Sequence, residues 1–260
     1  MSVENSLRIV SWNCCGSPSV RTLESARKQF REKLEAVATL DPDILILQEA
    51  PKEDALKVLG YTLLWSGSSL GRGICIGVSQ RIDSLRFVRE TRSSLTVQCG
   101  DFYVVGVWSK PEGNSSFQKY VDEVAEVIEA NRDLLQSGSA IVVGDFNSNV
   151  QWDQSTRRRS HSDNVRSLGS FGLSSAYHTF HGCEQGEEPE ATFFMHRNLE
   201  KGFHIDYCFL PAGWEAWTVE IGRFDDWVSR SDHCPVIVDL GSALEEKASG
   251  NADQRMEMSP

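Results

Sequence analysis

Ile141-Val142-Val143-Gly144-Asp145-Phe146-Asn147-Ser148 is the most informative stretch of this chain. An apolar strand ends here and delivers Asp145 and Asn147, two residues apart. Residues at this spacing leave a strand on the same face, so we expect both side chains to enter one pocket. A carboxylate can orient a water there and a carboxamide can hold a phosphate oxygen. The same residue types are also ordinary turn formers, so the stretch by itself leaves a simple turn open.

Four further polar clusters accompany apolar runs in the same chain. Three of them border such a run and one carboxylate lies inside a run. An ionised carboxylate within an apolar strand is costly unless it is paired or bound to a metal. The clusters that we expect to share a site are Ser11-Trp12-Asn13 after 7–10, Gln48-Glu49 after 44–47, Asp206 within 204–210 and Ser231-Asp232-His233 before 236–240.

Strand and helix patterns alternate along the chain. Apolar residues at helical spacing predict helices at about 24–39 and 117–135, each between two strands. Strand-like runs outnumber the helices, which favours an α/β fold with two sheets packed face to face and helices outside. The remaining runs lie at 74–78, 85–88, 95–97, 102–107, 191–195, 204–210 and 236–240.

The composition is that of a globular protein. The chain has 260 residues, 40% hydrophobic and 24% charged, with no linker, so we expect a single domain over 1–240 and a disordered tail over 241–260. There is no apolar run of about 20 residues and no signal-like start, so no membrane association is expected. Seven cysteines without CxxC pairs favour a reducing compartment, the cytoplasm, whereas the oligomeric state is left open.

The net charge of −11 bears on possible partners. Proteins that bind duplex nucleic acid mainly through phosphates usually carry a basic surface, so a nucleic acid substrate is expected to bind weakly or transiently. Arg158, within Arg157-Arg158-Arg159, follows the Asp145 strand closely enough to contact a polyanion at the pocket rim. A solvated surface loop is an equal alternative for this run.

The chain resembles the endonuclease/exonuclease/phosphatase superfamily, with its DNase I-like and exonuclease III-like branches. The resemblance covers roughly residues 7 to 240 and fits a compact stand-alone bacterial subgroup. It implies a four-layer α/β sandwich of two mostly antiparallel sheets and Mg²⁺- or Mn²⁺-dependent cleavage of phosphate esters. The motifs that carry it, in order, are Ser-Trp-Asn at 11–13, Gln-Glu at 48–49, Gly-Asp-Phe-Asn at 144–147, Ile-Asp-Tyr at 205–207 and Ser-Asp-His at 231–233.

The resemblance also implies the metal ligands. Glu49 would be the principal ligand, with Asn13 and Asp232 supporting the ion directly or through water. The chemistry of Mg²⁺ agrees, because this ion prefers hard oxygen ligands and keeps several waters.

The catalytic roles follow in the same way. Asp145 would position and activate the attacking water, and Asn147 would donate to a phosphoryl oxygen. His233, paired with Asp206, would stabilise the charge that develops on the phosphorus, and the carboxylate would fix the orientation of the ring.

The chain departs from the family pattern after the strand at 102–107. Many members carry a catalytic His or Tyr there, but this chain has Trp108, whose indole cannot transfer a proton at neutral pH. We expect Trp108 to contact the substrate instead. Lys110 is a candidate for supplying a positive charge to a phosphate. His178 or His181 is a candidate for supplying a second imidazole to the site. For each of them an ordinary structural or surface position is the alternative. Cys15 stands where repair-type members often have Asp.

Two functions remain open from the sequence. The first is a metal-dependent nuclease acting on DNA, including single-stranded or damaged DNA, or on RNA. The alternative is a phosphatase or phosphodiesterase for a small phosphorylated metabolite or signalling nucleotide, which suits the acidic balance. A binding module derived from an enzyme is disfavoured, because it has no need for the acidic and histidine residues that the chain retains.

Overall fold

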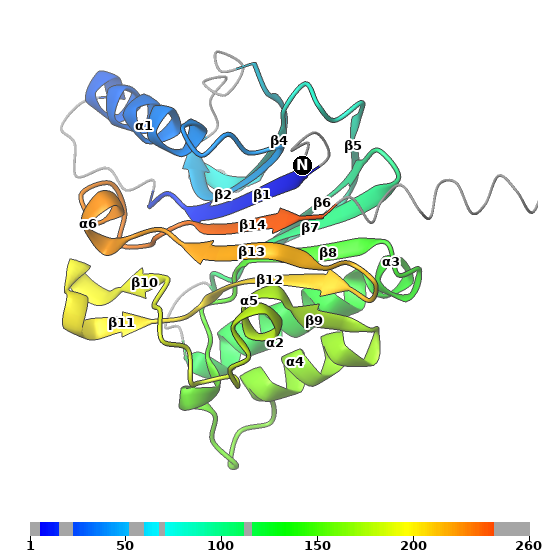
Figure 1. The fold of residues 1–260 in the computed structure, drawn as a ribbon. Helices are drawn as coiled ribbons and strands as arrows, with labels where there is room; N and C mark the ends of the chain where they lie inside the picture. The colour runs from blue at the N-terminus through cyan, green and yellow to red at the C-terminus, as the bar shows by residue number, and fades with distance from the viewer. Residues whose placement is uncertain (1–5, 16–22, 52–59, 68–70, 112–115, 242–260) are drawn as a thin grey trace, which may run out of the picture.

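Two six-stranded sheets face each other in the computed structural model, with helices on their outer sides (Figure 1). The structure describes residues 6–15, 23–51, 60–67, 71–111 and 116–241. This is the α/β sandwich that the sequence predicts. Among the described residues no helix has the length and apolar character needed to cross a membrane. The predicted tail lies outside the described residues from position 242 onward.

The first sheet has the strand order β13-β14-β1-β2-β4-β3. β1 and β2 run parallel because α1 (Leu23–Ala38) crosses between them, and all other neighbouring pairs are antiparallel. Its strands are β1 (Leu7–Asn13), β2 (Ile44–Pro51), β3 (Thr62–Gly67), β4 (Arg72–Val78), β13 (Ala216–Ile221) and β14 (Val236–Leu240).

The second sheet repeats this plan in the order β5-β6-β7-β8-β12-β9. Its one parallel pair is β7 and β8, and the crossover between them contains α2 (Phe117–Ala130) and α3 (Arg132–Gln136). Its strands are β5 (Leu85–Thr91), β6 (Ser94–Cys99), β7 (Phe102–Trp108), β8 (Ala140–Asp145), β9 (Leu173–Ser175) and β12 (Asp206–Pro211).

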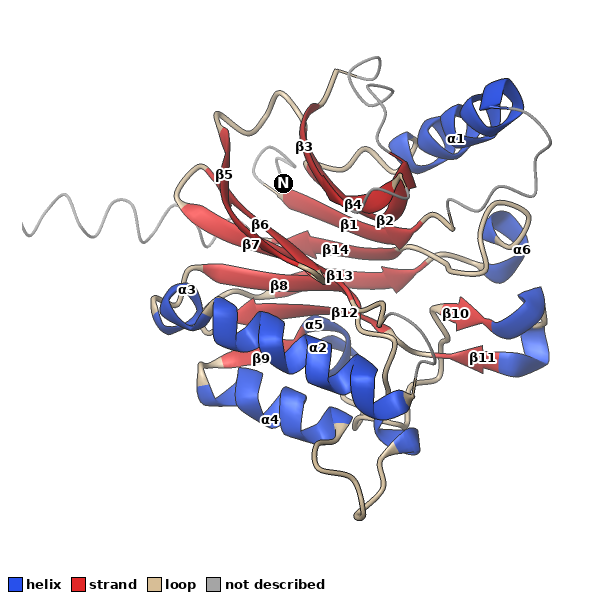
Figure 2. Cartoon of the chain, turned by 180° about the vertical axis from the view of Figure 1, so that it is seen from behind, coloured by secondary structure: helices blue, strands red, loops and turns tan. Residues whose placement is uncertain are grey.

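Alternation along the strands divides the buried residues of the second sheet between two cores. In β8, Ile141 and Val143 join the core between the sheets, whereas Val142 joins the core beneath α2 and α4 (His161–Ser170). Figures 1 and 2 show α1 on the outer side of the first sheet and α2, α3 and α4 on the outer side of the second. Asp145 continues the inward series of Ile141 and Val143, so its carboxylate faces the first sheet.

Smaller elements border the end of the sandwich where β1 finishes and β14 begins (Figure 1). A short hairpin there joins β10 (Phe193–Phe194) to β11 (Gly202–Phe203) through two 3-10 turns, η3 (Met195–Arg197) and η4 (Leu199–Lys201). The other short elements are η2 (Val150–Trp152), α5 (Ala176–His181) and α6 (Phe224–Trp227).

The structure corrects the predicted helix at 117–135. It ends at Ala130, and a separate α3 follows Asn131. The side chain of Asn131 is buried, donates to the carbonyl of Val127 and accepts a hydrogen bond from Thr96 of β6. A side chain that bonds the backbone of the preceding turn competes with helical continuation, which explains the break.

Candidate active site

The five sequence motifs meet at one end of the sandwich. Asn13 is the last residue of β1 and Asp145 the last of β8, whereas Asp206 is the first residue of β12. His233 lies just before β14, where it forms an isolated bridge with Phe193 of the hairpin. Strand ends from both sheets therefore surround one site, as the sequence predicts.

Four motif residues that the sequence analysis gave no role hold the motifs together. The indole of Trp12 donates to the carbonyl oxygen of His233 at 2.9 Å. The hydroxyl of Ser231 donates to the carbonyl of Asn13 at 2.7 Å, and Gln48 donates to the hydroxyl of Ser11 at 3.0 Å. These bonds are buried and join segments that are far apart in the sequence, so they hold the motifs next to one another.

Asp145 accepts three hydrogen bonds from amides. Its Oδ2 receives the side chains of Asn13 at 2.9 Å and Asn147 at 2.8 Å, and its Oδ1 receives the backbone N–H of Asn147 at 2.8 Å. Asn147 also donates to the carbonyl of Ser109 at 3.0 Å. The carboxylate orientation is therefore fixed from both sheets.

The convergence of Asp145 and Asn147 has a different cause from the predicted one. The strand ends at Asp145, and Asn147 has a φ of 50°, so a left-handed turn rather than strand alternation returns its side chain to the carboxylate. Asparagine tolerates this conformation better than most residues. The turn at Asn147 is therefore also what brings the Asn147 side chain to the Asp145 carboxylate.

The environment of Asp145 favours its protonated form. Complete burial is the main cause, and the neighbouring carboxylate of Asp206 adds to it, so the pKa of Asp145 is raised to about 7. His233 and the amide donors act in the opposite direction. A carboxyl group with a pKa near neutrality suits proton transfer better than an ordinary aspartate does.

Asp206 and His233 form a buried pair. Nδ1 of His233 donates to Oδ2 of Asp206 at 2.9 Å, and the hydroxyl of Thr192 donates to the same oxygen at 2.6 Å. Burial lowers the pKa of His233, but the charge of Asp206 and the hydrogen bond to it outweigh burial and raise the pKa to about 9. The ring is therefore an imidazolium at neutral pH, and Phe193 packs against it with ring centroids 4.8 Å apart. Thr192 is a positioning residue that sequence reasoning missed.

The donor set fits a hard divalent cation. Ligand atoms of Asp145, Asp206 and His233 lie within 4.8 Å of one another. Oδ1 of Asp206 is buried and has no hydrogen-bond partner within the described part of the chain, which a cation would correct. Because the imidazole is protonated at neutral pH, the carboxylate oxygens are the better ligands, and these are the atoms that Mg²⁺ and Mn²⁺ prefer.

The predicted ligand Glu49 lies in an irregular part of β2. Its φ is 56°, at a register shift between Leu47 and Ala50, and its Oε2 accepts a hydrogen bond from Arg72 at 2.8 Å. Burial, then the charges of Asp232 and Glu49, raise the pKa of the Cys15 thiol, which lies beside both carboxylates. The predicted ligands Asn13, Glu49 and Asp232 thus border one region, and their role in metal binding stays a prediction.

The predicted substrate-binding residues lie in three different places. Trp108 is paired in register with Asp145 in β7 and β8, next to the acidic cluster. His178 lies on the outer side of the second sheet, where it bonds Glu188 at 3.0 Å and stacks on Tyr207. Arg158 is mostly exposed and pairs with Asp122 of α2 at 2.7 Å. Of the three, the structure brings only Trp108 next to Asp145, and all three roles stay predictions.

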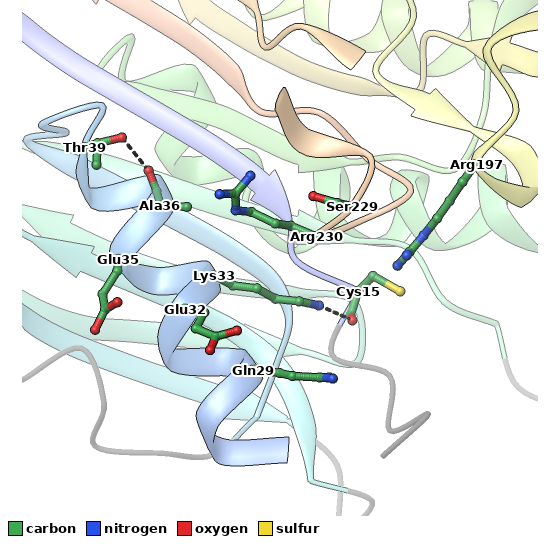
Figure 3. A pocket seen from close by; sticks show the side chains of 10 residues that line it. All are labelled: Cys15, Gln29, Glu32, Lys33, Glu35, Ala36, Thr39, Arg197, Ser229 and Arg230. Carbon is green, nitrogen blue, oxygen red and sulfur yellow. Dashed lines mark hydrogen bonds between the residues drawn. The ribbon is translucent and has the colours of Figure 1, made fainter. Parts of the chain in front are cut away.

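A large cavity of about 960 Å³ lies beside Cys15 and is lined by residues of α1, by Arg197 of the hairpin and by Ser229 and Arg230. Figure 3 shows Arg197 extending from the hairpin toward Cys15, while Lys33 of α1 donates to the carbonyl of Cys15 at 2.8 Å. The backbone of His196 and Arg197 is in the left-handed region, with φ values of 57° and 56°. The lining includes Glu32 and Glu35 as well as the basic residues, so its charge is mixed.

Fold and site together define a class of phosphoric ester hydrolases. The sequence matches the endonuclease/exonuclease/phosphatase family over residues 10–233, and the chain belongs to this family. The family resemblance inferred from the five motifs is thereby confirmed. A comparison with curated proteins found no match.

Solved structures with the same fold include several nucleases and related enzymes. The 3′-5′ exonuclease NExo from Neisseria meningitidis is 20% identical, with a TM-score of 0.66 and 89% of this chain and 98% of that chain covered. TDP2 of D. rerio, solved with a single-strand DNA product, is 16% identical, with a TM-score of 0.63 and coverages of 92% and 100%. The endonuclease domain of TRAS1, a telomere-specific non-LTR retrotransposon, is 16% identical, with a TM-score of 0.61 and coverages of 92% and 100%. At these identities the likeness shows the fold alone.

Proposed function

We propose that the protein is a divalent-metal-dependent phosphodiester hydrolase that acts on nucleic acid. DNA, including single-stranded or damaged DNA, is the preferred substrate in this proposal, with RNA as a further one. The observation that carries the proposal is the buried cluster in which the ligand atoms of Asp145, Asp206 and His233 lie within 4.8 Å of one another. The shared fold with enzymes solved on DNA products gives additional support.

In this proposal Asp145 acts as general base toward water. A bond forms between the water oxygen and phosphorus, and one water proton passes to the Asp145 carboxylate. The bond between phosphorus and the leaving oxygen breaks, and the leaving alkoxide takes up a proton from bulk water. Asn13 and Asn147 hold the carboxylate in place through their amides. A base with a pKa of about 7 is well matched to neutral conditions.

His233 stabilises the charge that grows on the phosphoryl oxygens. Its Nδ1 is engaged by Asp206, whereas Nε2 has no hydrogen-bond partner among the described residues and is left for the substrate. An imidazolium held by a buried carboxylate offers a fixed positive charge that needs no rearrangement during the reaction. Thr192 and Asp206 act as positioning residues for this ring.

A divalent ion would neutralise phosphate charge and polarise a phosphoryl oxygen when bound. We assign Glu49 as its principal ligand, with Asn13 and Asp232 supporting the ion directly or through water and Oδ1 of Asp206 nearby. Support comes from the shared influence of Glu49 and Asp232 on Cys15 and from the lack of a partner for Asp206 Oδ1. Mg²⁺ and Mn²⁺ are the ions that this oxygen-rich set suits.

A second candidate is hydrolysis of a small phosphorylated metabolite or signalling nucleotide. The net charge of −11 favours it, because long polyanions are repelled by an acidic surface. We further propose that 1–240 forms one domain and that the protein works in a reducing compartment such as the cytoplasm. All seven cysteines are free, which supports the latter.

The experiment is a substrate panel. The purified protein is incubated with Mg²⁺ or Mn²⁺ and offered plasmid DNA, single-stranded oligonucleotides, an abasic duplex, RNA and a small phosphodiester, with and without a chelator. Chelator-sensitive cleavage of a nucleic acid supports the nuclease. Turnover of small esters alone selects the second candidate, and cleavage that persists in the chelator contradicts the metal dependence.

A further inference from the structure

Lys33 lies at the border of the buried face of α1. Phe30 and Val37, three residues before it and four residues after it, belong to the hydrophobic core. Residues at these spacings share one side of a helix. Lys33 is accordingly half-buried, whereas Lys28 of the same helix is exposed. A lysine at such a border lays its stem along apolar surface and carries its ammonium to polar groups nearby.

The ammonium of Lys33 bonds the backbone that follows β1. Its Nζ donates to the carbonyl oxygens of Cys14 at 2.6 Å and Cys15 at 2.8 Å. Figure 3 shows the side chain extending from α1 toward Cys15, with this bond as a dashed line. Hydrogen bonds from an ionised donor are about twice as strong as neutral ones. One side chain of the outer helix therefore holds two consecutive peptide groups.

The first of these peptide groups also holds Asn13. The N–H of Cys15 belongs to the same peptide group as the Cys14 carbonyl, and it donates to Oδ1 of Asn13 at 3.0 Å. A peptide group is planar and trans, so a bond that directs its carbonyl also directs its N–H. A bond from an ammonium polarises the group as well and makes its N–H a better donor. Lys33 therefore strengthens the hydrogen bond that Asn13 accepts.

Asn13 carries this constraint to the acidic cluster. Its Nδ2 donates to Oδ2 of Asp145 at 2.9 Å. Because Oδ1 and Nδ2 belong to one planar amide, a bond that fixes Oδ1 also fixes the direction of Nδ2. A continuous chain of hydrogen bonds thus runs from Lys33 on α1 to the last residue of β8.

The backbone at Cys15 needs support from outside. Its φ is 42°, in the left-handed region that residues other than glycine seldom adopt. A conformation of this kind persists when surrounding bonds fix it. The sheet fixes one side, because the N–H and the thiol of Cys14 both donate to the carbonyl of Gln48, at 3.1 and 3.0 Å. Lys33 fixes the other side from α1.

We propose that Lys33 is a positioning residue of the active site. Its ammonium holds the peptide groups after β1 so that Asn13 presents its amide to Asp145 and to the divalent ion. The inference rests on the proposed function and adds to it a residue outside the acidic cluster.

A purely electrostatic role of Lys33 has the opposite consequence for a metal ion. A positive charge beside the carboxylates of Glu49 and Asp232 repels a cation, so loss of the charge alone tightens metal binding. Loss of a positioning residue weakens it, because Asn13 is no longer held toward the ion. The direction of the change in metal affinity therefore separates the two roles.

Calorimetric titration with Mn²⁺ measures this direction in wild type, Lys33→Met and the control Lys28→Met. Lys28 lies on the same helix, and its side chain is 79% exposed. We expect Lys33→Met to raise the dissociation constant about tenfold, as for other groups that orient a metal ligand, and Lys28→Met to keep the wild-type value. Unchanged or tighter binding in Lys33→Met would overturn the inference. Should circular dichroism show that Lys33→Met is unfolded, Lys33→Gln, which also removes the charge, takes its place.

Hydrolysis of a single-stranded oligonucleotide at saturating Mn²⁺ tests whether Lys33 acts through Asn13. We expect Lys33→Met to lower kcat about tenfold with KM within about twofold of wild type, because Lys33 orders the site and leaves substrate binding unchanged. In an Asn13→Ala background the same substitution should lower kcat less than about twofold. Equal losses of kcat in both backgrounds, or a rise in KM alone, would contradict the positioning role.

Hydrogen exchange separates this inference from the proposed function. If wild type hydrolyses none of the offered substrates, the proposed function fails, and exchange measured by mass spectrometry without metal or substrate decides the inference alone. We expect the backbone amides of residues 13–15 to exchange about tenfold faster in Lys33→Met, and at the wild-type rate in Lys28→Met. Equal exchange in wild type and Lys33→Met overturns the inference.

Discussion

Asp206 lies directly opposite Asp145 in the antiparallel pair of β12 and β8. Two carboxylates at such positions repel each other, and neither side chain is exposed to solvent. The arrangement is tolerable because His233 adds a positive charge to the same cluster and because Asp145 is held partly protonated. A buried pair of carboxylates lowers the stability of a fold, so its presence points to a functional site.

Gly144 sets the position of Asp145 through its backbone. Its φ is 141°, and a Cβ there would lie 2.1 Å from the carbonyl oxygen of Val107. We expect Gly144→Ala to lower the free energy of unfolding by about 3 kcal/mol or more, because strain and overlap add. Urea denaturation measures this. Gly138→Ala is the control, since that site has open space and only a positive φ of 69°. Equal stability of the two variants would contradict the backbone role.

If Glu49 is a metal ligand, as we propose, Arg72 competes with the ion for its carboxylate. The two side chains are bonded at 2.8 Å, so a cation that binds Glu49 displaces a positive charge already present. We expect Arg72→Gln to lower the dissociation constant of Mn²⁺ by about threefold to tenfold, because a nearby like charge is removed. Calorimetric titration with Mn²⁺ measures it, with Arg89→Gln, whose partner is Asp133, as control. Weaker binding in Arg72→Gln would show that Glu49 is not a ligand.

His161 makes the stability of the fold dependent on pH. Burial lowers its pKa from 6.5 to about 4, against the raising effects of Gln185, Asp153 and Glu188. Between those pH values the unfolded state binds a proton that the folded state does not, so stability falls as the pH falls from 6.5 toward 4. The contribution of this group over that range is about 2 to 3 kcal/mol.

Urea denaturation at pH 7.5, 5.5 and 4.5 checks this prediction. We expect the free energy of unfolding of His161→Gln to fall less steeply with acid than that of wild type, although its value at pH 7.5 is lower because the bond to Ser148 is lost. His196→Gln, at an exposed position, should keep the wild-type slope. A slope unchanged in His161→Gln would refute the assignment.

The sequence was sufficient for the parts of the fold that are set by local pattern. The two units of an apolar strand, a helix and a second apolar strand were predicted, and the structure pairs their strands in parallel as β1/β2 and β7/β8. The sequence could not predict the break at Asn131, because its cause is a tertiary hydrogen bond from Thr96 of a distant strand. Short edge elements such as β9 and β13 were missed because few of their residues carry a pattern of their own.

For the site, the sequence identified the residues but not the contacts that give them their properties. Asp145, Asp206 and His233 were predicted to meet, and their proximity is confirmed. The shifts in pKa depend on complete burial and on the register of β8 with β12, which no linear motif encodes.

The decisive measurement is the hydrolysis of a single-stranded oligonucleotide in the presence of Mn²⁺ by wild type, Asp145→Ala and His233→Ala. We expect each variant to be slower than wild type by about a thousandfold or more, because each removes a group that acts on the reacting atoms. Circular dichroism should show that both variants remain folded. Rates within about tenfold of wild type in either folded variant would contradict the assignment of this cluster as the catalytic site.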